Sequence, residues 1–241
     1  MDCGDDKIAT LIADLEQSDK PALRKVVDAL IQIAGTEPQI VETLTAHLAD
    51  TTRKNRWAIA YILASLPVPL DASAQILLDT LDHRDPDIRW AVALILVRLA
   101  KTDSHVLELL TELASKGSVN QRRMAIYALR DVGSRDPVSL DAIVNSLADP
   151  DPTVRVAAVT SLRMKTDLDN DGKIRLLELF LKDPDLRVRN TTAVTLAQLG
   201  ETSEEFLDAL RKANLSGNPQ LQKAASTALD ILKKRSAPSG S

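Results

Sequence analysis

Residues 85–100 read DPDIRWAVALILVRLA, and variants of this segment recur along the whole chain. An aspartate and a proline precede an arginine, and apolar residues then return every three or four positions, as they do on one face of a helix. Six other segments align with it: PALRKVVDALIQIAG (21–35), RKNRWAIAYILASL (53–66), VNQRRMAIYALRDVG (119–133), PTVRVAAVTSLRMK (152–165), LRVRNTTAVTLAQLG (186–200) and PQLQKAASTALDILK (219–233). A recurrence of this kind indicates a tandem repeat architecture.

One position, which we call the anchor, fixes the alignment at intervals of 32 to 34 residues. It is occupied by Arg24, Arg56, Arg89, Arg122, Arg155 and Arg189, and by Gln222 in the last copy. The residues three and seven positions after the anchor are small or apolar in every copy, such as Val92 and Leu96 after Arg89. Because these two positions share one helical face, we predict that they form the buried stripe of a helix.

A second amphipathic segment precedes each copy, for example IVETLTAHLAD at 40–50, so each repeat is expected to contain two helices. Only 2% of the residues are aromatic, and a core of Leu, Ile, Val and Ala favours helix packing. The predicted fold is all-α, a right-handed α-solenoid of seven two-helix repeats of about 33 residues. It spans residues 1–235, followed by a flexible tail at 236–241, with repeats at 5–35, 37–67, 69–101, 103–133, 136–166, 168–200 and 202–235.

The pattern of Asp-Pro, Val-Arg, small residues and leucine resembles the HEAT-like repeats of phycobilisome lyases and of many bacterial scaffold proteins. The resemblance covers residues 5–235 and implies a structural role for conserved polar positions of the repeat. In this chain it implies that Asp149 and Asp183 form a hydrogen-bonded ladder with Arg155 and Arg189 between neighbouring repeats. The Asp-Pro pairs at 85–86, 149–150 and 183–184 are expected to start helices, with each aspartate as the N-cap.

The second helices line the concave face of such solenoids, where ligands usually bind. Both tryptophans and both tyrosines of the chain lie one or five positions after an anchor, beside the buried stripe. Aromatic residues next to arginines suit a protein or peptide with acidic and apolar side chains, or a planar anionic ligand. The alternative is that these aromatics fill gaps between repeats. We predict a partner-binding strip of Trp57, Tyr61, Trp90, Leu94, Arg123, Tyr127, Arg130 and Arg163.

Residues 167–178, DLDNDGKIRLLE, match the pattern of a calcium-binding loop. Alternate carboxylates can converge on a hard cation, a glycine permits the tight turn, and a final glutamate can supply two oxygens. The candidate calcium ligands are Asp167, Asp169, Asp171 and Glu178. The alternative is a polar turn between repeats in which one of the aspartates caps the next helix.

No catalytic motif emerges from the remaining polar residues. The three histidines, His47, His83 and His105, are not followed by glutamate, unlike the His-Glu pairs of the di-iron hydroxylases of this fold. The single cysteine, Cys3, cannot form a disulfide or a cysteine-based zinc site within one chain. We therefore expect a protein that is not an enzyme and that requires no cofactor.

The net charge of −4 and the pI of about 5.5 disfavour nucleic acid as a partner, and with it the HEAT-like DNA glycosylases. No apolar run is long enough for a membrane span, and we expect a soluble, cytoplasmic protein. The predicted function is a non-catalytic protein-binding scaffold or adaptor that uses the concave face. The alternative is a phycobilin-lyase-like or chaperone-type protein that binds a bilin or another anionic cofactor there.

Overall fold

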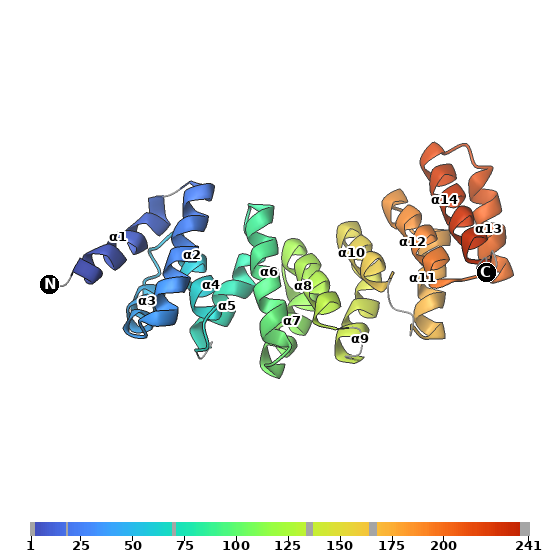
Figure 1. The fold of residues 1–241 in the computed structure, drawn as a ribbon. Helices are drawn as coiled ribbons and strands as arrows, with labels where there is room; N and C mark the ends of the chain where they lie inside the picture. Colours follow the sequence, from blue (N-terminus) through green and yellow to red (C-terminus); the bar gives the residue numbers. More distant parts are fainter. Residues whose placement is uncertain (1–2, 18, 69–70, 134–136, 164–167, 237–241) are drawn as a thin grey trace, which may run out of the picture. The chain divides into compact units, whose positions relative to one another are not determined.

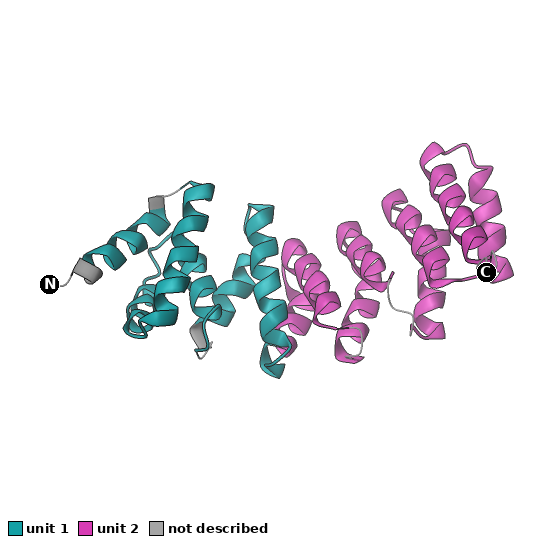
Figure 2. Ribbon diagram, in the orientation of Figure 1, with its two compact units in different colours: residues 1–106 teal, residues 107–241 magenta. Residues whose placement is uncertain are grey.

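The computed structural model describes residues 3–17, 19–68, 71–133, 137–163 and 168–236, and all the regular structure in these ranges is helical (Figure 1). Fourteen α-helices follow one another as seven pairs across the described ranges. The predicted all-α repeat solenoid is therefore confirmed. The chain divides into unit 1, residues 1–106, and unit 2, residues 107–241 (Figure 2).

Unit 1 contains three complete helix pairs. Their second helices, α2, α4 and α6, contact one another in sequence and form one layer of the unit. The pairs are α1 (Cys3–Gln17) with α2 (Lys20–Thr36), α3 (Gln39–Ala49) with α4 (Arg56–Ala64), and α5 (Asp71–Thr80) with α6 (Pro86–Ala100). Helix α7 (Ser104–Lys116) begins at the end of this unit.

Unit 2 repeats the same arrangement, with α8, α10, α12 and α14 as the layer of second helices. Between the first helices α11 and α13, Phe180 packs edge-on against Phe206 with ring centroids 5.7 Å apart. The elements are α8 (Val119–Val132), α9 (Pro137–Asn145), the 3-10 helix η1 (Ser146–Ala148), α10 (Pro152–Leu162), α11 (Asn170–Lys182), α12 (Leu186–Leu199), α13 (Glu204–Asn214) and α14 (Pro219–Ser236).

The predicted stripe after the anchor is buried. The residue three positions on is buried in all seven repeats: Val27, Ile59, Val92, Ala125, Ala158, Thr192 and Ala225. The residue seven positions on is buried in the five middle repeats and half-buried at Ile31 and Leu229, in the first and last repeats. Terminal repeats have a neighbour on one side only, which explains the partial exposure.

The Asp-Pro pairs start helices in two different ways. Asp85 is the N-cap of α6, and its carboxylate accepts from the backbone N–H of Asp87 at 2.9 Å, as predicted. For α10 and α12 the prediction was wrong, because the N-caps are Asp151 and Asp185, two residues after the expected aspartates. The carboxylates of Asp149 and Asp183 instead accept hydrogen bonds from arginines, as described below.

The last part of the chain is only partly described. Helix α14 continues through Ser236, the first residue of the predicted tail, and residues 237–241 lie outside the described ranges. Among the described residues, none of the helices combines the length and the apolar character that a membrane crossing requires.

Candidate functional site

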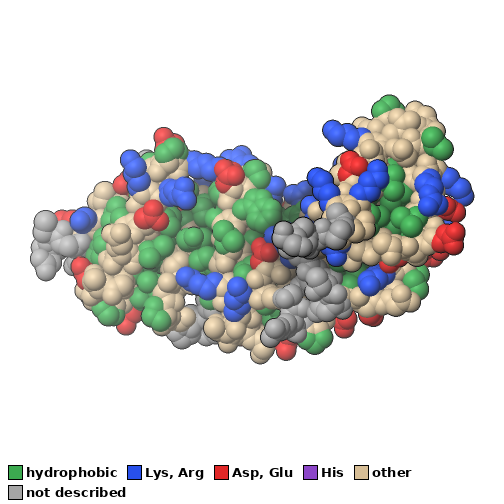
Figure 3. All heavy atoms as spheres, turned by 45° about the vertical axis from the view of Figure 1, so that its right-hand side comes forward, with side chains coloured by type: hydrophobic (Ala, Val, Ile, Leu, Met, Phe, Trp, Pro, Cys, Tyr) green, Lys and Arg blue, Asp and Glu red, His purple; other side chains and the backbone are tan. Residues whose placement is uncertain are grey.

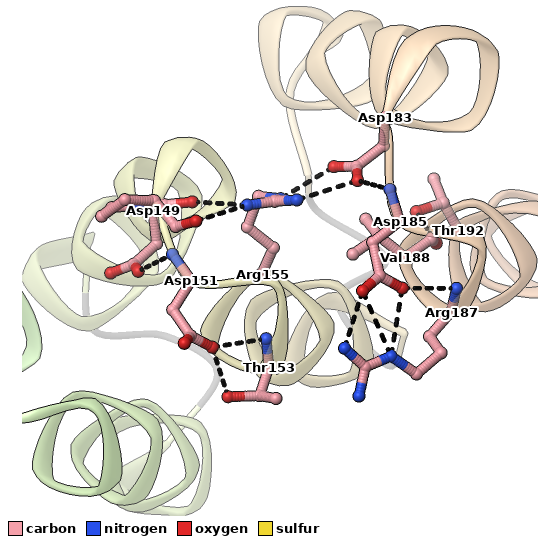
Figure 4. A network of polar contacts seen from close by, with 10 residues as sticks. Asp149, Asp151, Thr153, Arg155, Asp183, Asp185, Arg187, Val188 and Thr192 are labelled. Atoms are coloured by element: carbon pink, nitrogen blue, oxygen red, sulfur yellow. Dashed lines mark hydrogen bonds and ion pairs between the residues drawn. The ribbon is translucent and has the colours of Figure 1, made fainter.

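In unit 2 the anchor arginines join each repeat to the next. Arg122 donates two hydrogen bonds to the carboxylate of Asp149, at 2.7 and 2.9 Å. Arg155 does the same with Asp183, at 2.7 and 2.9 Å (Figure 4). Arg155 also donates to the backbone carbonyl of Asp149 at 2.8 Å, so the contacts form a continuous ladder. Its two-pronged, buried ion pairs raise the pKa of both arginines and keep them charged.

The implied ladder between neighbouring repeats is present for Asp149, Asp183 and Arg155, with Arg122 as a further member. The carboxylates of Asp149 and Asp183 bind the arginine of the preceding repeat, 27 and 28 residues earlier. Arg189 lies outside it and donates to the backbone carbonyl of Phe180 at 2.9 Å. Gln222, which replaces arginine in the last repeat, likewise donates to a backbone carbonyl, that of Ser216.

In unit 1 the anchor arginines form no such ladder. Arg56 donates to the carbonyl of Leu48 at 2.9 Å, and Arg89 donates to the carbonyl of His83 at 2.6 Å. The residue 27 positions after Arg56 is His83, which offers no carboxylate to a guanidinium group. Arg24 is exposed, and among the described residues it forms no side-chain hydrogen bond or ion pair.

Helix α4 lacks the first turn that the other second helices possess. Helices α6, α8, α10, α12 and α14 begin three residues before their anchor, whereas α4 begins at its anchor, Arg56. Residues 53–55 are Arg-Lys-Asn, so the Asp-Pro start is missing, and the N-cap residue Asn55 makes no side-chain capping bond. At the other end Pro67 follows the helix closely, and a proline disfavours helical backbone in the residue before it.

Residues 53–55 bind the end of α1 instead of forming a helical turn. The side-chain amide of Asn55 donates to the carbonyl of Leu15 at 2.6 Å, which satisfies one of the free carbonyls at the helix C-terminus. The backbone N–H of Lys54 donates to the carboxylate of Glu16 at 3.1 Å, and Arg53 lies 3.7 Å from the same side chain. These contacts hold the segment against α1.

A cavity of about 780 Å³ lies between α2, α4 and α6. Buried Leu23 and Val27 and the half-buried rings of Trp57 and Tyr61 give it apolar surface. The described residues that line it are Lys20, Pro21, Leu23, Arg24, Lys25, Val27 and Asp28 of α2, Trp57 and Tyr61 of α4, and Asp87, Ile88 and Ala91 of α6. The cavity belongs entirely to unit 1.

Lys20 connects the two outer helices of this layer across the start of α4. Its ammonium group lies 3.1 Å from the carboxylate of Asp85 and forms a second ion pair with Asp87. Hydrogen bonds to Asp87 and Asp85 raise the pKa of Lys20. The pKa of Asp85 is lowered, first by the backbone N–H of Asp87 and then by Lys20. The charge of Lys20 is therefore already neutralised within the protein.

Comparison with known families agrees with this repeat geometry. The family described as HEAT repeats matches residues 40–130, 74–163 and 140–230, which together span most of the chain. The chain belongs to the HEAT-repeat family. No curated protein matches the HEAT-repeat chain significantly.

Solved structures show the same HEAT-repeat fold at low sequence identity. A Kap121p mutant matches with a TM-score of 0.64 and 14% identity, over 93% of this chain and 29% of Kap121p. Kap121p bound to the extreme C-terminus of the phosphatase Cdc14p matches with a TM-score of 0.63 and 14% identity, and the shares of the two chains that are covered are the same. The E. coli protein YIBA matches with a TM-score of 0.55 and 16% identity, over 94% of this chain and 92% of YIBA. The chain thus spans less than a third of Kap121p.

Four residues of the predicted strip lie in unit 1 of the HEAT-repeat chain. Trp57 and Tyr61 line the cavity, and the indole N–H of Trp57 donates to the side-chain carbonyl of Asn55 at 3.3 Å. Trp90 and Leu94 lie one turn apart on α6, with 41% and 62% of their surface exposed. On the face drawn in Figure 3, hydrophobic side chains of unit 1 lie between groups of lysine and arginine side chains.

The other four residues of the predicted strip lie in unit 2, and all are half-buried. Arg130 lies over the ring of Tyr127, 5.2 Å from its centroid, and also pairs with Asp131 at 2.6 Å. Arg123 donates a long hydrogen bond of 3.4 Å to Asn120, and Arg163 follows α10 as its C-cap residue. Trp57 and Tyr61 thus share one cavity, Arg130 contacts Tyr127, and the partner-binding strip stays a prediction.

The candidate calcium ligands have other contacts in the HEAT-repeat chain. Asp169 caps α11 and accepts from the backbone N–H of Gly172 at 2.8 Å. Asp171 pairs with Arg175 at 2.8 Å, and Glu178 lies 3.6 Å from Lys182. Asp167 lies outside the described ranges, and residues 170–182 are helical, whereas a calcium loop winds around its ion. The calcium site stays a prediction that this geometry does not favour.

Within the described ranges, groups of three or more histidine, cysteine or acidic residues placed to hold a metal ion do not occur. Of the residues that line the cavity, the sequence analysis predicted only Trp57 and Tyr61 as binding residues. Lys20 was not considered, and Arg24 was assigned to the scaffold with the other anchors. The available signal was the Arg-Lys-Asn sequence at 53–55, where other repeats carry a helix-starting sequence.

Proposed function

We propose that this chain is a non-catalytic binding protein whose unit 1 holds an extended segment of a partner protein in the cavity between α2, α4 and α6. The observation that carries the proposal is the cavity itself, with Trp57 and Tyr61 in its lining. Its volume of about 780 Å³ falls in the range of binding pockets rather than of packing defects.

The surface beside the cavity supports a macromolecular partner. Ala91 lines the cavity, and Leu94 follows it by one turn on the same side of α6. Leu94 and Trp90 are both exposed, which adds apolar surface beyond the cavity itself. Tryptophan and tyrosine contribute strongly to protein interfaces, because they bury a large area at a small entropic cost.

Structural neighbours support the same class of partner. Kap121p has been solved bound to the extreme C-terminus of Cdc14p and bound to Nup53p, so a HEAT-repeat structure similar to this chain binds protein segments. Identities of 14% and 15% limit this support to the fold and to protein binding in general.

The test is Ala91→Phe, which places an aromatic ring in the cavity from the α6 side. Random peptides displayed on phage are selected on the wild-type chain, and the enriched peptides are synthesised and titrated by fluorescence polarisation. We expect them to bind Ala91→Phe at least about tenfold more weakly, a loss of about 1.4 kcal/mol. Equal affinity for the two proteins would place the binding surface elsewhere.

The matched control is Ile174→Ser on α11, which removes an exposed apolar side chain that lies outside the layer of second helices. This variant should retain the affinity of the wild type. A tetrapyrrole is the competing occupant, since the cavity is also large enough for a small anionic ligand. Visible absorbance changes with biliverdin that Ala91→Phe abolishes, together with no peptide enrichment, would support that occupant instead.

A further inference from the structure

Arg24 occupies the same position of the repeat as five other arginines but has none of their contacts. Arg56, Arg89, Arg122, Arg155 and Arg189 each donate at least one hydrogen bond to a backbone carbonyl of the preceding segment. Arg24 donates none within the described ranges and is exposed. A guanidinium group with five donors is thus available for an external acceptor.

Asp50, the residue that would bind Arg24 in a ladder, accepts hydrogen bonds from other residues. Asp50 precedes its anchor by six residues, as Asp149 and Asp183 do in unit 2. Its carboxylate accepts from the backbone N–H and the hydroxyl of Thr52, at 3.0 and 2.7 Å, and lies 3.7 Å from Arg53. Hydrogen bonds from Thr52 and the charge of Arg53 lower the pKa of Asp50. The local sequence after α3 therefore satisfies Asp50 and leaves Arg24 without this partner.

The cavity has an asymmetric distribution of charge. Lys20 is paired with Asp85 and Asp87, so Arg24 and Lys25 are the lining cations that remain without an ion pair among the described residues. Asp28 lies one turn beyond Arg24 on α2 and also lines the cavity. A negative group is therefore favoured near the first two turns of α2 and disfavoured one turn further on.

We propose that Arg24 selects partner segments in which an aspartate or glutamate neighbours the apolar side chain that enters the cavity. The guanidinium binds the carboxylate through two parallel hydrogen bonds, while the apolar side chain contacts Trp57 and Val27. The repulsion from Asp28 restricts the motif to a single carboxylate rather than an acidic run. This inference rests on the proposed function, since it names the chemistry of the segment that the cavity binds.

The test uses a synthetic peptide array with paired members. Each pair has a central leucine or phenylalanine and carries either aspartate or glutamate, or the isosteric asparagine or glutamine, at one flanking position. Binding is measured by fluorescence polarisation at low and at high salt. For the wild type we expect the acidic member of the best pair to bind about tenfold more tightly than its neutral twin.

Arg24→Met should reduce the acidic member to the affinity of its neutral twin and leave the neutral twin unchanged. The charge-matched control is Lys101→Met, which removes an exposed cation from unit 1 outside the cavity lining and should preserve the preference. The thermal midpoint of Arg24→Met should equal that of the wild type, because among the described residues the side chain makes no hydrogen bond or ion pair that the substitution would remove.

Two failures are distinguishable. If the wild type binds the acidic and neutral peptides of each pair equally, or if Arg24→Met keeps the preference, the proposed role of Arg24 is wrong. Weaker binding of both peptides to Ala91→Phe would still support the cavity as the binding site. If Ala91→Phe binds every peptide as tightly as the wild type, or if the wild type binds none, both the inference and the proposed function are wrong.

Discussion

Units 1 and 2 are built from the same repeat but use its arginine differently. In unit 2 the guanidinium groups of Arg122 and Arg155 are buried between a backbone carbonyl and a carboxylate of the next repeat. Among the described residues of unit 1, Arg56 and Arg89 donate to backbone carbonyls, and Arg24 binds neither a carbonyl nor a carboxylate. The layer of second helices in unit 1 contains the cavity of about 780 Å³, whereas that of unit 2 is cross-linked by the ladder.

The difference shows how few residues convert a scaffold position into a surface position. His83 stands where unit 2 has an aspartate, and residues 53–55 stand where α6 and α10 have Asp-Pro or its equivalent. The first change removes a carboxylate, and the second removes the first turn of α4, a helix that lines the cavity. Neither change touches the buried stripe, so the fold is preserved while the surface changes.

The strongest test of this comparison is Arg155→Met. It leaves the carboxylate of Asp183 buried, with only 2% of its side chain exposed, and without its cation. Loss of one partner of a buried ion pair costs about 3–5 kcal/mol, and we expect unit 2 to lose this much stability. Urea unfolding followed by far-UV circular dichroism measures both units, whereas tryptophan emission reports unit 1 alone because Trp57 and Trp90 both lie there.

Arg24→Met is the matched variant at the same repeat position, and its free energy of unfolding should stay within about 0.5 kcal/mol of the wild type. A large loss in Arg24→Met would show that Arg24 is a scaffold residue after all. A loss in Arg155→Met that shifts the tryptophan transition as much as the dichroism transition would show that the two units unfold together.

The second test concerns the segment that replaces the missing turn. Asn55→Ala removes the hydrogen bond to the carbonyl of Leu15 at the end of α1 and the hydrogen bond that Asn55 accepts from the indole N–H of Trp57. Each hydrogen bond contributes about 1 kcal/mol, so unit 1 should lose about 1–2 kcal/mol in the tryptophan-detected transition. Asn214→Ala, at the exposed end of α13 in unit 2, should leave the same transition unchanged. An unchanged Asn55→Ala protein would mean that residues 53–55 are positioned by other contacts.

The fold could be predicted from the sequence because its signal is repeated. The alignment places Val27, Ala125 and Ala225 in equivalent positions, so each repeat independently predicts the same buried stripe. The starts of α10 and α12 could not be placed correctly, because both Asp149 and Asp151 are good caps. Which of the two aspartates caps the helix depends on Arg122, a residue of the preceding repeat.

The candidate site was predicted only in part, since it depends on a departure from the repeat. Trp57 and Tyr61 could be recognised by type and position. The role of Arg24 could not, because its position in the alignment predicts a scaffold contact. Its release follows from the contacts of Asp50 with Thr52 and Arg53, which depend on the local conformation after α3.

The smallest expected effect is a pH dependence confined to unit 1. Partial burial, together with the charge of Arg53, lowers the pKa of His47 below its usual value of 6.5. The folded state then favours the neutral ring, so this contribution to stability is complete above pH 6.5 and is lost as the pH falls through the lower folded-state pKa. The urea concentration at the midpoint of the tryptophan-detected transition should therefore decrease when the pH is lowered from 7.5 to 5.5.

Unit 2 should not respond in this window. Its capping carboxylate Asp185 has a pKa lowered to about 2, chiefly by Arg187, so its contribution is lost only below the usual aspartate pKa of 3.8. His47→Gln should abolish the pH dependence of unit 1 while leaving unit 2 unchanged. If His47→Gln retains the dependence, another titrating group is responsible. An equal shift in the dichroism transition of unit 2 would mean that the two units unfold together, and the contrast between them would then concern binding surfaces rather than stability.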